Sequence, residues 1–225
     1  MATKKNEEVI SIRPIELKKV TVRIVGDSPL IMHAWSEKAK RMMLEAQQGK
    51  KKGKAKEYRN PVAEFIDSMY WLEGKPTITD DMGEDECEAA FVDAVQSGAR
   101  FGFPVTAIKQ AGNSAAYRQG WVKNQMGLRG AYFINSDENG FVEIHSDTPI
   151  LREDMVRIGM GSADLRYRGE FRNWYADLEI TYNEGGEYSL EAILNVINAG
   201  GFICGIGEWR PEKDGDYGRY HLEAN

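Results

Sequence analysis

The sequence predicts an α+β fold, and two kinds of hydrophobic periodicity indicate it. In several short segments apolar and polar residues alternate, which is the pattern of half-buried strands. In other segments apolar residues recur every three to four positions, which is the pattern of amphipathic helices. With 225 residues, 42% of them hydrophobic, the chain is long enough to bury one sizeable core, and we expect a single domain over residues 1–225.

The N-terminal half begins with a strand and continues with helices. A strand is expected over 17–25, where Val20, Val22 and Ile24 alternate with polar residues before a turn cluster at 26–29. Four segments then carry helical spacing or start signals and are expected to be helices: 37–48, 62–72, 83–95 and 104–118.

The C-terminal half returns to strands. Four segments alternate and are expected to be strands: 131–135, 141–145, 154–160 and 174–182. Turn residues at 137–140 predict that the first two form a hairpin, and 159–162 is expected to be a flexible bend. Ser189 is expected to cap the clearest helix, Gly200 to end it, and a strand over 219–223 to close the chain.

This order of strand, helices, strands, helix and strand matches a ferredoxin-like (RRM-like) sandwich. The match requires large helical and charged insertions, which we place at about residues 36–100.

Two runs of like charge fall in that insertion, although the net charge of the whole chain is only −6. The segment 38–59 is basic and the segment 80–93 is acidic. The basic run is expected either to grip a phosphate backbone or to be a solvated face, with a mobile loop over 49–54. The acidic run is expected to be a solvated helix surface, with a basic partner as the alternative.

Cysteine and histidine usage limits the chemistry. Cys87 and Cys204 are far apart, and the three histidines have no metal-ligand spacing, so we expect no metal, no cofactor and no catalytic residue. The sequence has no apolar run long enough to cross a bilayer and no export signal at its start. We therefore expect a protein of the cytoplasm, without a membrane partner.

The segment 200–220 combines six glycines with aromatic and cationic residues. Main-chain N–H groups in such a loop are able to approach phosphates, while Trp209 stacks on bases and Arg210, Lys213 and Arg219 neutralise charge. The alternative is that the glycines only permit tight turns between a helix and a strand.

With its glycine-rich loop between the last helix and the last strand, the sequence resembles the RAMP superfamily, which includes RNA-binding subunits of CRISPR effector complexes. The resemblance covers roughly the C-terminal third of the chain. It implies binding of single-stranded RNA or DNA, RNA being favoured, and assembly as a homo-oligomer or a ribonucleoprotein subunit. The nucleic-acid-binding role that the resemblance implies is assigned to six residues of this sequence: Gly205, Gly207, Arg210, Gly215, Gly218 and Arg219.

Residues 158–220 also resemble uncharacterised tailed-phage proteins, which implies a viral origin and a host cytoplasm. Nearby, arginines are interleaved with aromatic residues over 152–175. We expect Arg166, Arg168 and Arg172 to extend the binding groove, and the alternative is that they pair with neighbouring carboxylates.

Two other functions stay open. One is a protein-interaction module, for example a phage-encoded inhibitor that uses the acidic surface. The other is a metal-independent endoribonuclease with His33 as its general base, although a lone histidine beside an apolar run is more often structural.

Overall fold

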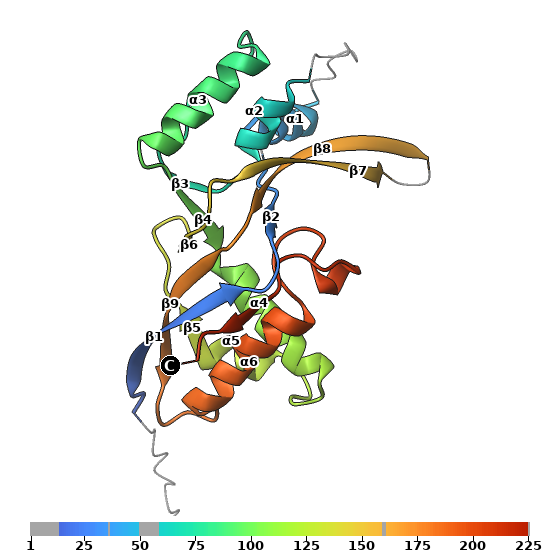
Figure 1. Ribbon diagram of the computed structural model, residues 1–225. Coiled ribbons are helices and arrows are strands. Elements are labelled where there is room, and N and C mark those ends of the chain that lie inside the picture. The colour runs from blue at the N-terminus through green and yellow to red at the C-terminus, as the bar shows by residue number, and fades with distance from the viewer. Residues whose placement is uncertain (1–13, 36, 50–58, 159–160, 225) are drawn as a thin grey trace, which may run out of the picture.

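The computed structural model describes residues 14–35, 37–49, 59–158 and 161–224. It confirms the α+β class: helices and antiparallel sheets are mixed along the chain. Figure 1 shows one group of helices at the upper end of the molecule and another at the lower end, where strands run beside them. Within these residues no helix has both the length and the apolar content needed to cross a membrane.

The largest sheet has four strands, which are β1 (Leu17–Gly26), β5 (Tyr132–Ile134), β9 (Tyr175–Asn183) and β10 (Tyr220–Leu222). Their order across the sheet is β10-β1-β9-β5, and all neighbours are antiparallel. If the four strands are numbered by their order in the chain, they lie across the sheet in the order fourth, first, third, second. The strands expected over 17–25, 174–182 and 219–223 are therefore confirmed.

Two long helices cover one side of this sheet, α4 (Val105–Arg118) and α6 (Leu190–Ile203) (Figure 1). Ser189 caps α6 as expected, with its hydroxyl accepting from the Ala192 N–H. Gly200 does not end the helix. A Cβ on Gly200 would lie 2.6 Å from the Gly112 nitrogen, so this glycine lets α6 approach α4 closely.

A second sheet joins β2 (Leu30–Met32), β8 (Ser162–Phe171) and β7 (Ile150–Ile158). Beyond β2, strands β7 and β8 continue as a two-stranded arm that projects from the body (Figure 1). The expected strand at 154–160 belongs to β7 as far as Ile158, and residues 159–160 lie outside the described residues. Strand β8 was not expected, although Ala163, Leu165 and Tyr167 alternate with charged residues in it, because this segment was interpreted only as arginines interleaved with aromatic residues.

The third sheet joins β3 (Trp71–Glu73), β4 (Arg100–Pro104) and β6 (Phe141–Ile144). The hairpin expected around 137–140 is wrong, because β5 pairs with β9 and β6 pairs with β4. Both strands exist, but tertiary partners replace the local pairing. The helix expected over 62–72 ends early, as α2 (Pro61–Asp67), and β3 follows it.

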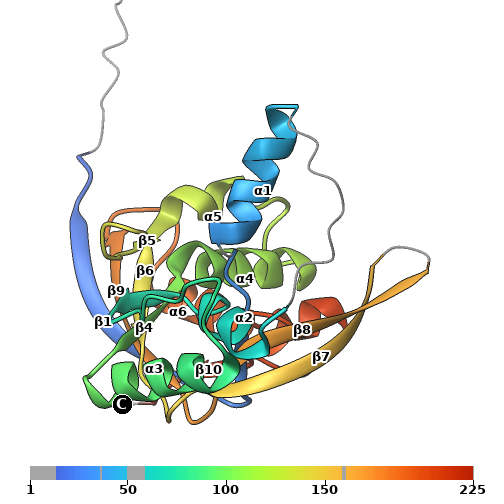
Figure 2. The same cartoon turned by 90° about the horizontal axis from the view of Figure 1, so that it is seen from above.

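Helices α1 (Glu37–Gln47) and α3 (Glu84–Gln96) are confirmed, and Figure 2 shows α1 standing away from the body. Much of the acidic run belongs to α3. Glu84, Asp85 and Glu86 lie in its first turn, where carboxylates stabilise the positive end of a helix. Residues 50–58 of the basic run, and with them most of the loop expected over 49–54, lie outside the described residues.

Candidate nucleic-acid interface

The glycine-rich loop between α6 and β10 folds back on itself. Gly205, Gly207 and Gly218 have φ angles of +64°, +78° and +64°, which side chains rarely adopt. A Cβ on Gly218 would lie 1.8 Å from the Ile206 carbonyl oxygen, and one on Gly215 would lie 1.8 Å from that of Trp209. The loop is therefore held tight by backbone packed on backbone.

This packing contradicts the expectation that main-chain N–H groups of the loop are free to approach phosphates. The N–H groups of Gly205, Gly215 and Gly218 donate to the carbonyls of Gly200, Arg210 and Pro29, at 2.9, 3.1 and 2.8 Å. Since these donors are already used, they are not free to bind phosphates. These glycines instead permit tight turns between the helix and the strand, which was the alternative interpretation.

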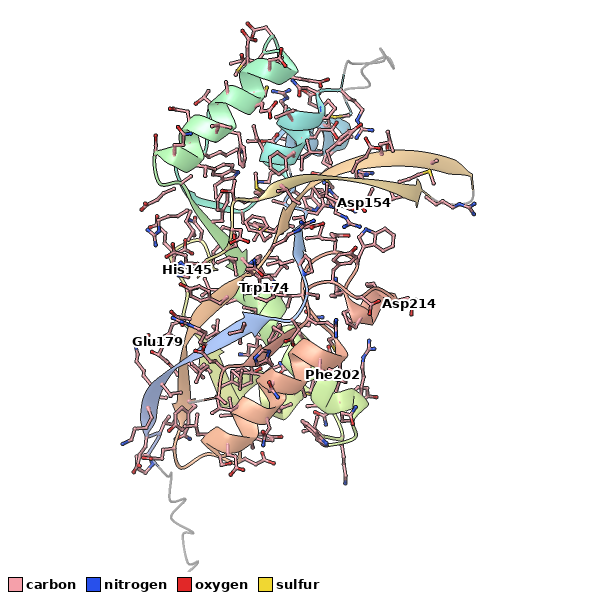
Figure 3. The ribbon with its side chains drawn as sticks, viewed as in Figure 1. His145, Asp154, Trp174, Glu179, Phe202 and Asp214 are labelled. Atoms are coloured by element: carbon pink, nitrogen blue, oxygen red, sulfur yellow. The ribbon has the colours of Figure 1, made fainter. Side chains whose placement is uncertain are left out.

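The tip of the loop is different, because its side chains reach solvent. Trp209 is 38% exposed although its φ is +52°, a strained value for a bulky residue. Lys213 is exposed as well, and Figure 3 shows the neighbouring Asp214 at the outer end of the loop. Arg210 is held by Glu212 and by the Gly207 carbonyl, while Arg219 donates to the Asp216 carbonyl.

The arginines of the arm are paired with carboxylates. Arg168 is buried and its Nη1 lies 3.1 Å from Asp154, which also accepts from Arg152 at 2.9 Å. Arg152 and Arg172 both bind Glu170, at 2.8 Å each. These side chains form the charge network of the arm, defined as Arg152, Asp154, Arg168, Glu170 and Arg172.

Arg166 lies outside that network and binds Asp164 at 2.9 Å. Its side chain stays partly exposed. Of the three arginines expected to line a groove, Arg166 and Arg172 therefore face solvent in part, whereas Arg168 is structural in the absence of a ligand. Arg157, nearer the tip of the arm, is exposed.

The arm and the glycine-rich loop meet as expected. The Arg168 Nη2 lies 3.5 Å from Glu208, and the Arg152 Nη1 donates to the Tyr217 hydroxyl at 3.2 Å. The Arg152 guanidinium also stacks over the Tyr217 ring, 4.5 Å from its centroid. Figure 3 shows Asp154 of the arm and Asp214 of the loop on the same side of the molecule.

His33 joins two cavities beside this contact. One, of about 250 Å³, lies between the loop and the start of α4. The other, of about 970 Å³, lies between α1, α2 and the arm. Because His33 lines both, the two cavities are neighbours, and we call them together the trench.

Aromatic and cationic side chains line the larger part of the trench. Trp35 is 61% exposed, and Tyr167 of β8 lines the same cavity. The cations of this wall are Arg41, Arg59, Lys75 and Arg166. Three of them bind carboxylates: Arg59 binds Glu64 and Asp164, Lys75 binds Asp67, and Arg166 binds Asp164.

The sheet face away from α4 and α6 offers a less suitable surface. Its cations are paired in a ladder, Arg23 with Asp177 at 2.7 Å and Lys19 with Glu179 at 2.8 Å. Tyr175 is covered by the His145 ring and by Arg23. Phe133 of β5 is 56% exposed here, so this face is less suitable because its cations are paired, not because it lacks aromatic side chains.

Two residues of the trench were missed by sequence reasoning. Trp35 lies in a short segment after β2 that the Ala34 N–H anchors to the Ser68 carbonyl at 2.7 Å. Glu208 lies within the glycine-rich segment and was passed over as an acidic residue. A search for aromatic residues beside short apolar runs would have found Trp35.

No model of a known protein family matches the chain, and no curated protein matches it either. In the part of the chain that the structure describes, no group of three or more His, Cys, Asp or Glu side chains is placed to hold a metal ion.

Proposed function

We propose that this protein binds single-stranded nucleic acid, with RNA favoured, along the trench and without catalysis. The observation that carries the proposal is that His33 lines both cavities of the trench, so that an aromatic and cationic wall lies next to the glycine-rich loop. Trp35 supplies an exposed face on which a base stacks, and Arg166 supplies a cation beside it.

The RAMP assignment is part of the same proposal. Supporting it is the strand order of the largest sheet, fourth, first, third, second, with α4 before the second strand and α6 before the fourth. This is the order expected of a βαββαβ ferredoxin-like domain. In this reading residues 36–100 are the insertion, copies assemble along the strand, and the protein acts in the cytoplasm, or the host cytoplasm for a phage protein.

The test is a fluorescence-anisotropy titration of labelled single-stranded RNA and DNA at two salt concentrations. We expect affinity to fall with salt, because phosphate contacts release counterions. A flat signal at micromolar protein at both salt concentrations contradicts the proposal.

Two tryptophans make a matched pair for locating the site. Trp35→Ala is expected to weaken binding roughly tenfold, since stacking contributes about 1–3 kcal/mol per base. Trp121 is exposed to a similar extent, 54% against 61%, but lies on a different groove. Trp121→Ala is expected to leave the affinity unchanged, and equal losses in both variants would remove the trench from the proposal.

A protein-interaction module is the second candidate, and the groove at Trp121 favours it. This groove, of about 840 Å³, lies between α6 and the segment 119–128, and Phe202 beside it is 73% exposed. Exposed aromatic residues around a concave apolar surface are typical of protein docking sites. If a partner binds there, a pull-down from nuclease-treated lysate loses it with Trp121→Ala and keeps it with Trp35→Ala.

The endoribonuclease alternative depends on His33. Its ring lies 3.7 Å from Glu208, an arrangement of base and carboxylate that is compatible with proton transfer. Labelled RNA that stays intact during incubation with the protein argues against it, whereas cleavage that disappears in His33→Gln would replace the non-catalytic proposal.

A further inference from the structure

Glu208 occupies the junction between the arm, the loop and the trench. Its carboxylate lies 3.5 Å from the Arg168 Nη2 and 3.7 Å from the His33 Nδ1. Charge-assisted hydrogen bonds are usually about 2.7–2.9 Å long. Both contacts are longer than that, so the carboxylate is held loosely by two potential cations.

Arg168 has donor capacity that the protein does not use. It is only 4% exposed, and within the described residues its Nε has no hydrogen-bond acceptor. A buried donor without an acceptor is unfavourable, and a guanidinium carries five N–H donors. Arg168 is therefore able to bind an anion more fully than Glu208 does.

The local charge is balanced only when Glu208 is counted. Arg152, Arg168 and Arg172 contact three carboxylates, those of Asp154, Glu170 and Glu208. A phosphodiester added to this set would leave one excess negative charge. If the Glu208 side chain swings out while the phosphate enters, the balance is restored.

The backbone around Glu208 allows such an exchange. The Glu208 N–H donates to the Ile31 carbonyl at 3.0 Å, which anchors the main chain to β2. Its neighbours Gly207 and Trp209 both have left-handed φ angles, +78° and +52°. This turn directs the Glu208 side chain toward Arg168, while 41% of that side chain is exposed and has space to rotate.

We propose that Glu208 is an internal, displaceable ligand that occupies the position of a phosphate between Arg168 and His33. In the free protein it keeps the buried guanidinium paired. When a single strand enters the trench, one backbone phosphate replaces it. This inference rests on the proposed function, and it names the phosphate position within the trench.

The test compares two variants that remove the same charge. Glu208→Gln removes the internal ligand. Glu179→Gln is the control, because Glu179 is 46% exposed and also ion-paired, with Lys19, and lies on the opposite edge of the molecule (Figure 3). Anisotropy with single-stranded RNA is expected to show about tenfold tighter binding for Glu208→Gln, equivalent to about 1.4 kcal/mol, and less than a twofold change for Glu179→Gln.

The salt dependence gives a second readout. In the original protein the displaced Glu208 carboxylate takes up a cation from solution, which offsets one cation that the strand releases; Glu208→Gln lacks this uptake, so the salt slope is expected to rise, by at most roughly 0.7. Equal affinity gains in both glutamine variants would overturn the inference, because they would report only the change in net charge. Weaker binding by Glu208→Gln would overturn it as well.

An experiment without nucleic acid separates this inference from the proposed function. The chain has three histidines, so the His33 ring signal can be assigned in NMR spectra from a His33→Gln variant. Inorganic phosphate is expected to shift that signal at lower concentration in Glu208→Gln than in the original protein. If it does so while RNA fails to bind, the proposed function is wrong and the anion site stands; if RNA binds and phosphate never shifts the signal, the anion site is wrong.

Discussion

The layer formed by the four-stranded sheet with α4 and α6 is held together differently from the arm. In the layer, Ile24, Leu178 and Ile193 are completely buried, and apolar side chains fill the space between the sheet and the two helices. At the base of the arm the buried side chains include Asp154, Arg168 and Glu170. Hydrophobic burial thus stabilises the layer, whereas paired charges fix the position of the arm.

Because of this difference, the layer and the arm respond differently to substitutions. Apolar contacts are not directional, so the layer tolerates substitutions of similar volume. A buried ion pair adds little net stability but is costly to break, because an unpaired charge remains inside the protein. The arm is therefore the part of the molecule whose position depends on single residues, and it is also the part that borders the trench.

Breaking the charge network of the arm is expected to have the largest effect. Arg168→Met leaves Asp154 buried with less compensation, so we expect a loss of about 4 kcal/mol in the free energy of unfolding. The double variant Arg168→Met/Asp154→Leu removes both charges and is expected to recover most of that loss. Urea unfolding curves measure both, and equal losses would show that packing, not charge, holds the arm.

In the layer, Leu178→Ala creates a cavity without leaving a charge. We expect a loss of about 3 kcal/mol in the free energy of unfolding. Unlike the variants of the arm, this one is expected to lower the protection of all slowly exchanging amides together, because Leu178 lies in the common core. Hydrogen exchange measures the protection of these amides. If Leu178→Ala lowered protection only in the arm, the proposed difference between the layer and the arm would be wrong.

The loop that joins the two regions is expected to respond more moderately. Gly218→Ala combines a left-handed φ with a contact on the Ile206 carbonyl, and we expect a loss of about 2 kcal/mol. Gly130 in α5 (Met126–Ala131) has open space around its missing Cβ. Gly130→Ala should instead stabilise the protein by about 0.5 kcal/mol. Thermal unfolding of the pair measures the difference.

Lowering the pH is expected to loosen the arm before the layer. Of the four predictions, this one has the smallest expected effect. Burial raises the pKa of Glu170, but hydrogen bonds from Arg152 and Arg172 outweigh it, so the pKa lies below its ordinary value. A lowered pKa contributes stability above the unfolded value of about 4.3. That stability is lost as the pH falls through the folded pKa.

Hydrogen exchange of arm amides at pH 7, 5 and 3.5 measures this loss, which is expected only at the lowest value. Glu170→Gln is expected to flatten the dependence. The assignment to Glu170 would be contradicted if the protection of arm amides were equally low at all three pH values, or if it fell together with the protection of the layer.

Local sequence patterns determined much of this protein. Alternation identified β1 and β9, and the spacing of apolar residues together with Ser189 identified α6. Each of these depends on neighbouring residues in the chain, because side chains two or four positions apart share a face. The α+β class followed from the same patterns.

Tertiary structure decided the rest, because pairing partners and burial depend on residues distant in sequence. Nothing local to 131–145 shows that β5 pairs with β9 while β6 pairs with β4. Nor does the sequence near Arg168 reveal that Asp154 and Glu208 surround it. The glycines of the loop were visible from the start, but whether their N–H groups faced solvent or other carbonyls was settled by how the chain folds back on itself.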